Sequence, residues 1–139
     1  CYDSQFASVS TQLRGINPDL FLVPSMTGKK GLNSVRWAAQ ARSVEHYATV
    51  IVTGTVDPKN PEGGDHVGQA VMIPPQDDAL HLPNLISEGP FNRPALVTGS
   101  IDVDLILAAK KKAGLFSSRD DLQRNTSVVV NAQCNLLLK

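Results

Sequence analysis

The sequence predicts an α/β fold in which helices cover a sheet, and three observations lead to this prediction. Two short apolar runs, 20–23 and 49–53, have the composition of buried strands. Between them, residues 32–47 show helical periodicity, which is the arrangement of a strand–helix–strand crossover. The 139 residues are enough for one domain with a core of its own.

The first expected element is a helix over 4–14. Its apolar residues Phe6, Val9 and Leu13 are spaced three and four apart, as on one face of a helix. Cys1 therefore stands directly before a helix.

Two buried strands are expected to follow. Residues 20–23 are a continuous apolar run closed by Pro24, a pattern that predicts burial on both faces of the strand. Residues 49–53 are β-branched throughout and end at Gly54, which predicts a second buried strand.

The helix expected over 32–47 is amphipathic. Arg36 and Arg42 fall off its buried stripe, and the outer face is predicted to be strongly polar. The stripe consists of Leu32, Val35, Ala39, Ser43 and His46.

The second half of the chain predicts further strands and one more helix. A third strand is expected over 67–73, a brief pairing over 84–88 and a fourth strand over 95–103. A helix is expected over 105–113, with Asp104 as its cap.

Composition excludes several classes of function. Thirteen basic residues cancel thirteen acidic ones, so no net charge favours nucleic acid or an anionic membrane surface. The longest apolar runs are far shorter than the ~20 residues that cross a bilayer. Two cysteines suggest no disulfide-stabilised secreted scaffold, and reduced thiols in a cytoplasmic protein are expected.

Cys1 is the first candidate for chemistry. The backbone N–H groups and dipole of a helix start favour an anion, so a cysteine there is stabilised as the reactive thiolate. A lone cysteine can also be a simple packing residue. Because translation begins with Met, Cys1 is either a nucleophile released by processing or the first residue of a fragment, and the rest of the chain favours the fragment.

Four sequence blocks occur in a matching order and spacing: 1–6 (CYDSQF), 19–27 (DLFLVPSMT), 35–45 (VRWAAQARSVE) and 49–56 (TVIVTGTV). Together they resemble the carbon–nitrogen hydrolases of the nitrilase superfamily. The resemblance covers about residues 1–121, and its specific parts are the Cys-Tyr-Asp and Gln-Ala-Arg-x-x-Glu blocks. Residues 122–139 form a tail of uncertain structure.

This resemblance implies that the chain is the C-terminal half of a four-layer α-β-β-α sandwich and begins at the catalytic cysteine. The family hydrolyses a linear amide or nitrile through a cysteine thioester, without a cofactor or metal. Its glutamate and lysine precede the cysteine, so the chain alone is expected to be inactive and to need the missing N-terminal segment. Lys29, Lys30 and Glu45 are not expected to replace them.

The resemblance also implies roles for individual residues. Cys1 is the nucleophile, and the backbone N–H of Tyr2 helps to hold the oxyanion. Arg42 and Glu45 form a structural ion pair, and the family's usual Glu-Asn is Glu45-His46 in this chain. The expected substrate pocket contains Ser4, Gln5, Ser25, Met26 and Thr27.

Family members usually dimerise through the helices that correspond to 4–14 and 32–47, so a homo-oligomer is expected. One alternative is a non-catalytic half-domain that binds a partner. Another is an N-terminal-nucleophile hydrolase, which predicts strands directly after Cys1 and is disfavoured by the helical pattern there. No metal is expected, because the three histidines lack ligand spacing: His46, His66 and His81.

Overall fold

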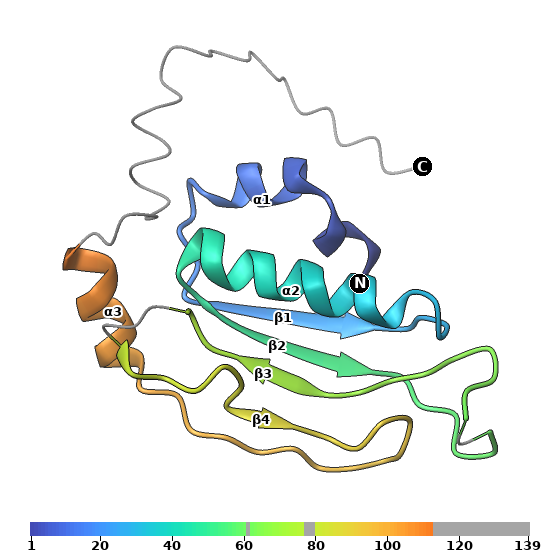
Figure 1. Ribbon diagram of the computed structural model, residues 1–139. Coiled ribbons are helices and arrows are strands. Elements are labelled where there is room, and N and C mark those ends of the chain that lie inside the picture. The colour runs from blue at the N-terminus through green and yellow to red at the C-terminus, as the bar shows by residue number, and fades with distance from the viewer. Residues whose placement is uncertain (61, 77–79, 113–139) are drawn as a thin grey trace.

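The computed structural model describes residues 1–60, 62–76 and 80–112 (Figure 1). Within these ranges the chain forms a mixed sheet of four strands in the order β1-β2-β3-β4, with helices α1 and α2 over one face. The elements are η1 (Tyr2–Gln5, a 3₁₀-helix), α1 (Ala7–Leu13), β1 (Leu20–Ser25), α2 (Leu32–His46), β2 (Thr49–Gly54), β3 (Val71–Ile73), β4 (Ser87–Glu88) and α3 (Val103–Lys112).

The strand–helix–strand crossover predicted from the sequence is confirmed. β1 and β2 pair in parallel with Leu20 opposite Thr49, and α2 connects them. β3 is antiparallel to β2, with Val52 opposite Val71, and the short β4 is antiparallel to β3. The predicted pairing within 84–88 is therefore present, over two residues.

The core lies between α2 and the sheet. Strand residues alternate between two faces, and Val35 and Ala39 of α2 are almost fully buried against the inner one. Cys1 packs at the margin of this core. The main cluster consists of Val23, Val35, Ala39, Val50, Val52, Val71 and Ile73.

The opposite, outer face of the sheet is apolar and partly open. Leu20 and Leu22 are 46% and 69% exposed, while Ile51 is half-buried and Met72 is buried. The prediction that strand 20–23 is buried on both faces is thus wrong for Leu20 and Leu22. None of the described helices covers these two side chains on the outer face.

The predicted helix 32–47 is confirmed over Leu32–His46. It ends at Tyr47, whose φ of 50° places it in the left-handed region that closes many helices. The outer face, predicted to be strongly polar, also carries two exposed apolar residues, Trp37 and Val44. Arg42 is buried instead, because its guanidinium binds the chain that follows Cys1.

The expected helix 4–14 is interrupted. Phe6 is extended, with φ −98° and ψ 125°, and separates η1 from α1. Cys1 is the residue before η1, so it does precede a helix, but a short 3₁₀-helix.

Two predictions for the second half are corrected. The strand expected over 67–73 is regular only over Val71–Ile73, because Val67 instead bridges to Thr27. Residues 95–102 are not a strand, and α3 already begins at Val103.

A side chain caps the start of α3. Asp102, rather than Asp104, supplies the cap, since its Oδ1 accepts a hydrogen bond from the backbone N–H of Leu105 at 2.9 Å. The tail 122–139 and Cys134 lie outside the described residues.

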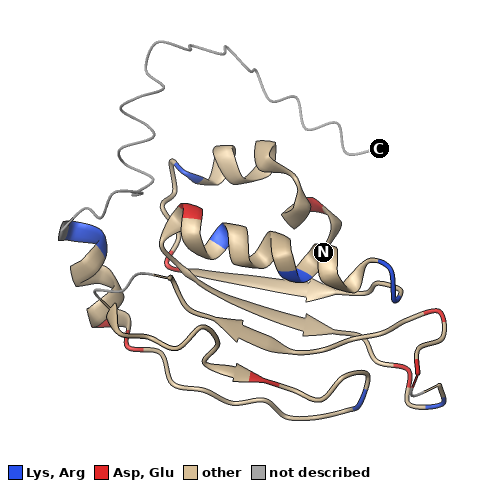
Figure 2. Cartoon of the chain, viewed as in Figure 1, with Lys and Arg blue, Asp and Glu red and all other residues tan. Residues whose placement is uncertain are grey.

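In the described part of the chain, charged side chains are confined to helices, loops and the end of β4. Figure 2 shows β1, β2 and β3 without a single Lys, Arg, Asp or Glu. Among the described helices, none has both the length and the apolar character needed to cross a membrane.

Two glycines allow the backbone to cross closely at the end of β2. A Cβ on Gly68 would lie 2.6 Å from the carbonyl carbon of Gly54, which is itself opposite Ser25 in the sheet. We expect Gly68→Ala to lower the free energy of unfolding by about 1–3 kcal/mol, the usual effect of overpacking. Urea denaturation measures this change.

Gly15→Ala is the matched control, because a Cβ at Gly15 meets no atom within 4 Å. Its effect should be small or slightly stabilising. Equal destabilisation by the two substitutions would contradict the close crossing at Gly68.

Candidate functional site

Cys1 lies at the carboxyl end of β1. Its thiol is free and half-buried, and Sγ is 3.2 Å from Oγ of Ser25, the last residue of that strand. Sγ also lies 3.8 Å from the carbonyl oxygen of Met26, to which the thiol can donate. The structure thus brings together Cys1, Ser25 and Met26, three of the residues predicted from the sequence.

The residues after Cys1 wind back over it. Ser4 donates from its hydroxyl to the carbonyl oxygen of Cys1 at 2.6 Å, so this side chain fixes the backbone of the segment. Tyr2 opens η1, where the first N–H groups have no partner within the helix. Its ring is exposed and packs edge-on against Phe6. Gln5 is half-buried at the end of η1.

Thr27 is engaged elsewhere. It pairs with Val67 through the backbone, and its hydroxyl lies 3.4 Å from the carbonyl oxygen of Gly28. Met26 contributes its carbonyl to the thiol, while its side chain is 62% exposed. Thr27 therefore shapes the loop after β1 rather than contacting Cys1.

A cavity of about 190 Å³ opens beside the thiol. It lies between the η1–α1 segment and β1, whose outer edge pairs with no strand among the described residues. Cys1, Ser4, Phe21, Val23 and Arg42 are among its lining residues.

Arg42 connects α2 to the segment that carries Cys1. Its Nη1 donates to the carbonyl oxygens of Ser4 and Phe6, both at 3.3 Å. Its Nη2 forms an ion pair with Glu45 at 2.9 Å. Glu45 is therefore held by a cation on its own helix.

The two lysines after β1 are exposed. Nζ of Lys29 donates to the carbonyl oxygen of Glu62 at 3.1 Å, and Glu62 lies in the loop between β2 and β3. Lys30 is exposed as well. Among the described residues, no group of three His, Cys, Asp or Glu side chains is placed to hold a metal ion.

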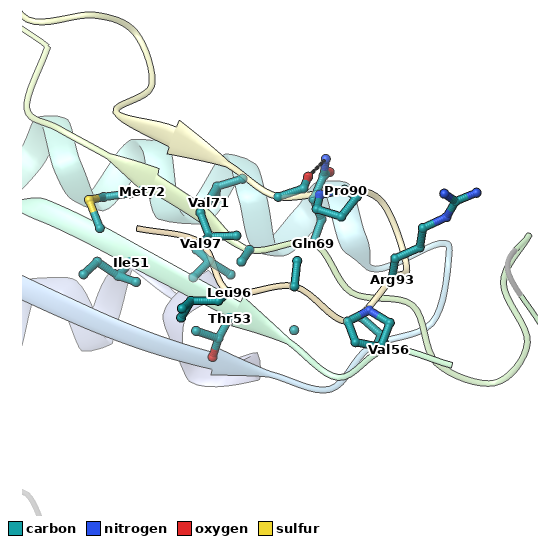
Figure 3. Close-up of a pocket in the computed structure, with 16 residues that line it drawn as sticks. Ile51, Thr53, Val56, Gln69, Val71, Met72, Pro90, Arg93, Leu96 and Val97 are labelled. Atoms are coloured by element: carbon teal, nitrogen blue, oxygen red, sulfur yellow. Dashed lines mark hydrogen bonds between the residues drawn. The ribbon is translucent and has the colours of Figure 1, made fainter. Parts of the chain in front are cut away.

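A larger cavity, of about 380 Å³, lies on the outer face of the sheet and contains none of the predicted site residues (Figure 3). Ile51, Met72, Leu96 and Val97 give it an apolar lining, while Arg93 extends away from them. Sequence reasoning missed this cavity because the apolar residues of 95–103 were interpreted as a strand. The Pro90 and Pro94 positions that flank it are the signal for a loop.

Asn92 secures the loop next to this cavity. The side chain is fully buried, accepts a hydrogen bond from the backbone N–H of Asp57 at 2.9 Å and donates to the carbonyl oxygens of Asp57 and Asn60. The side-chain amide of Asn60 also hydrogen-bonds the Asp57 carboxylate and lowers the pKa of that exposed group.

No protein-family model matches the chain. Over 128 residues, 90% of its length, the chain is 24% identical to a Bacillus subtilis (strain 168) protein named "Probable hydrolase YhcX". It spans about a quarter of the length of that protein.

The hydroxyl of Ser25, 3.2 Å from Sγ, can donate a hydrogen bond to the thiolate of Cys1. We expect Ser25→Ala to slow alkylation of Cys1 by iodoacetamide at neutral pH by about fivefold, which corresponds to the loss of one hydrogen bond of ~1 kcal/mol. Mass spectrometry of the N-terminal peptide gives the rate for Cys1 separately from that for Cys134.

Ser8→Ala is the control, because Ser8 is exposed on α1. An unchanged Cys1 rate in Ser25→Ala would show that the 3.2 Å contact does not stabilise the thiolate. Faster alkylation of Cys134 than of Cys1 would argue against Cys1 as the nucleophile.

Proposed function

We propose that this chain is the cysteine-bearing half of a hydrolase of the nitrilase type, which cleaves a non-peptide carbon–nitrogen bond in a linear amide or nitrile. The observation that carries the proposal is the position of Cys1, with its thiol against Ser25 at a strand end and its backbone leading into η1. The similarity to a protein named as a hydrolase supports the general class.

In the proposed reaction the Cys1 thiolate attacks the carbonyl carbon of the amide. The developing oxyanion accepts a hydrogen bond from the backbone N–H of Tyr2, and the C–N bond breaks as the amine takes up a proton. The resulting thioester is cleaved by water, which releases the acid and restores the thiol. A nitrile would reach the same thioester after addition of one water and loss of ammonia.

The proposed chemistry needs more than this chain supplies. A carboxylate must move protons, and a cation must help to hold the oxyanion. Glu45 is ion-paired with Arg42, and Lys29 donates to the carbonyl oxygen of Glu62 in the loop after β2. Asp3 lines the cavity beside the thiol, but the proposed family uses a glutamate that precedes the cysteine. We therefore assign the glutamate and lysine of the proposed triad to a further segment. The relative's length, about four times the matched region, is consistent with such an arrangement.

The surfaces left open by the described residues suit that segment. The unpaired edge of β1 can accept a strand leading into Cys1, beside the cavity of about 190 Å³. The charge-free outer face, with Leu20 and Leu22 exposed, can pack against a second sheet, as a four-layer sandwich requires.

A second copy of the chain is the proposed partner of α2. Trp37 and Val44 are seven residues apart, so they share one exposed face of this helix, with 64% and 41% of their surfaces accessible. Phe6, 42% exposed, precedes the neighbouring α1.

The two alternatives make different predictions. A non-catalytic half-domain would bind a partner through the same open faces and show no hydrolysis even when complete. An N-terminal-nucleophile hydrolase would use the amine of Cys1 as its base, and the helices η1 and α1 directly after Cys1 do not favour that architecture.

Replacing the nucleophile in the complete gene product tests the proposal. We expect Cys1→Ala to reduce amide or nitrile hydrolysis by at least about 10⁴-fold, because covalent catalysis is lost, while circular dichroism stays unchanged. Hydrolysis of short aliphatic amides and nitriles is followed by release of ammonia.

Cys134→Ala is the matched control and should retain full activity. A complete protein that still turns over substrate with Ala at position 1 would refute the thioester mechanism. Turnover by a purified chain of residues 1–139 alone would instead favour the N-terminal-nucleophile alternative.

A further inference from the structure

A buried polar network lies on the side of α1 that faces α2. Ser10 is 1% exposed, and its Oγ lies 2.5 Å from Oε2 of Glu45 and 2.8 Å from Nε2 of His46. His46 is fully buried, and its ring lies against Phe21 of β1, with the ring centroids 4.9 Å apart. These contacts join α1, α2 and the sheet.

The protons of this network can be assigned by counting donors. A carboxylate only accepts, so the single hydroxyl proton of Ser10 is donated to Glu45. The serine oxygen must then accept from Nε2–H of His46. Nδ1 is buried without a hydrogen-bond partner in the described part of the chain, and because a proton there would have no acceptor, the neutral imidazole is favoured.

The network continues to the nucleophile. Glu45 binds Ser10 through Oε2 and Arg42 through Oε1, and Arg42 donates to the carbonyl oxygens of Ser4 and Phe6. The backbone N–H and the hydroxyl of Ser4 both donate to the carbonyl oxygen of Cys1. An unbroken series of hydrogen bonds thus runs from His46 to Cys1.

We propose that Ser10 and His46 are positioning residues for Cys1, and that the neutral imidazole is what holds the segment 1–6 with its thiol against Ser25. The inference rests on the proposed function only in taking Cys1 as the nucleophile. On protonation, Nδ1 becomes a second donor in a buried position without an acceptor, and the contact between α1 and α2 loosens.

The charges around His46 favour the neutral ring. Burial is the largest cause that lowers the pKa of His46 below the ordinary 6.5. Arg42 on α2, Arg14 after α1 and Lys110 on α3 lower this pKa further, and only the adjacent Glu45 raises it among the described residues.

Neutral His46 makes the folded chain more stable at high pH than at low pH. The unfolded chain takes up the proton near pH 6.5 and the folded chain at a lower pH. The stabilisation by neutral His46 is therefore complete above the unfolded pKa and is lost as the pH falls towards the folded one.

The test compares wild type with His46→Gln, whose amide N–H can still donate to Ser10 but does not titrate. The readout is the alkylation rate of Cys1 by iodoacetamide from pH 5 to 8, divided by the rate for a peptide of residues 1–6 at the same pH. At pH 5 we expect the wild-type ratio to be about fivefold below that of His46→Gln, well within the roughly hundredfold effect of a 1 Å misplacement. At pH 8 the two ratios should agree, because stabilisation of the thiolate by the folded chain affects both proteins alike.

Two further variants complete the experiment. Ser10→Ala keeps His46 but removes the hydroxyl that connects it to Glu45, so the ratio of the Cys1 alkylation rate to that of the peptide should be low at every pH. This variant still tests the proposal if His46→Gln does not fold. His66→Gln alters a histidine outside the network and should behave as wild type. The same pH profile in wild type and His46→Gln, or a wild-type ratio in Ser10→Ala, would overturn the proposal. Because alkylation requires no hydrolysis, this outcome is independent of the test of Cys1→Ala.

Discussion

Val35 and Ala39 bring α2 close to β1 and β2, because neither residue carries a long side chain and both are almost fully buried. This packing depends on the parallel pairing of the two strands, and the pairing in turn depends on α2 as its connection. Because α2 lies this close to the sheet, Arg42 can reach the carbonyl oxygens of Ser4 and Phe6. The site is thus a consequence of how tightly one helix lies on two strands.

The elements that the sequence predicted well are those whose pattern is local. The β-branched run of β2 and the periodicity of α2 record burial residue by residue, and both were placed to within a residue. Leu20 and Leu22 were misjudged because burial of a second face depends on a layer that the run itself cannot specify. The segment 95–102 was misjudged because apolar residues that cross a sheet face without pairing resemble a strand in composition.

In the candidate site, too, contacts between distant segments could not be predicted from local sequence patterns. The nearness of Cys1 to Ser25 and Met26 was predicted from the resemblance to the nitrilase superfamily and not from the local pattern of either segment. Ser10 was not, because a serine on a short helix gives no sequence signal of burial, and its role exists only where α1 crosses the end of α2. For the same reason, the sequence predicts that His46 lies on the buried stripe of α2 but does not predict its hydrogen bond with Ser10.

Under the proposed function, the edge of β1 that pairs with no strand of the described residues has a thermodynamic consequence. A strand added there would gain main-chain hydrogen bonds along the whole of β1 and, at the same time, border the cavity beside the thiol. Completion of the sheet and assembly of a reactive centre would then be a single linked equilibrium. Substrate that binds the assembled centre would strengthen the sheet by the same factor by which the added strand strengthens substrate binding.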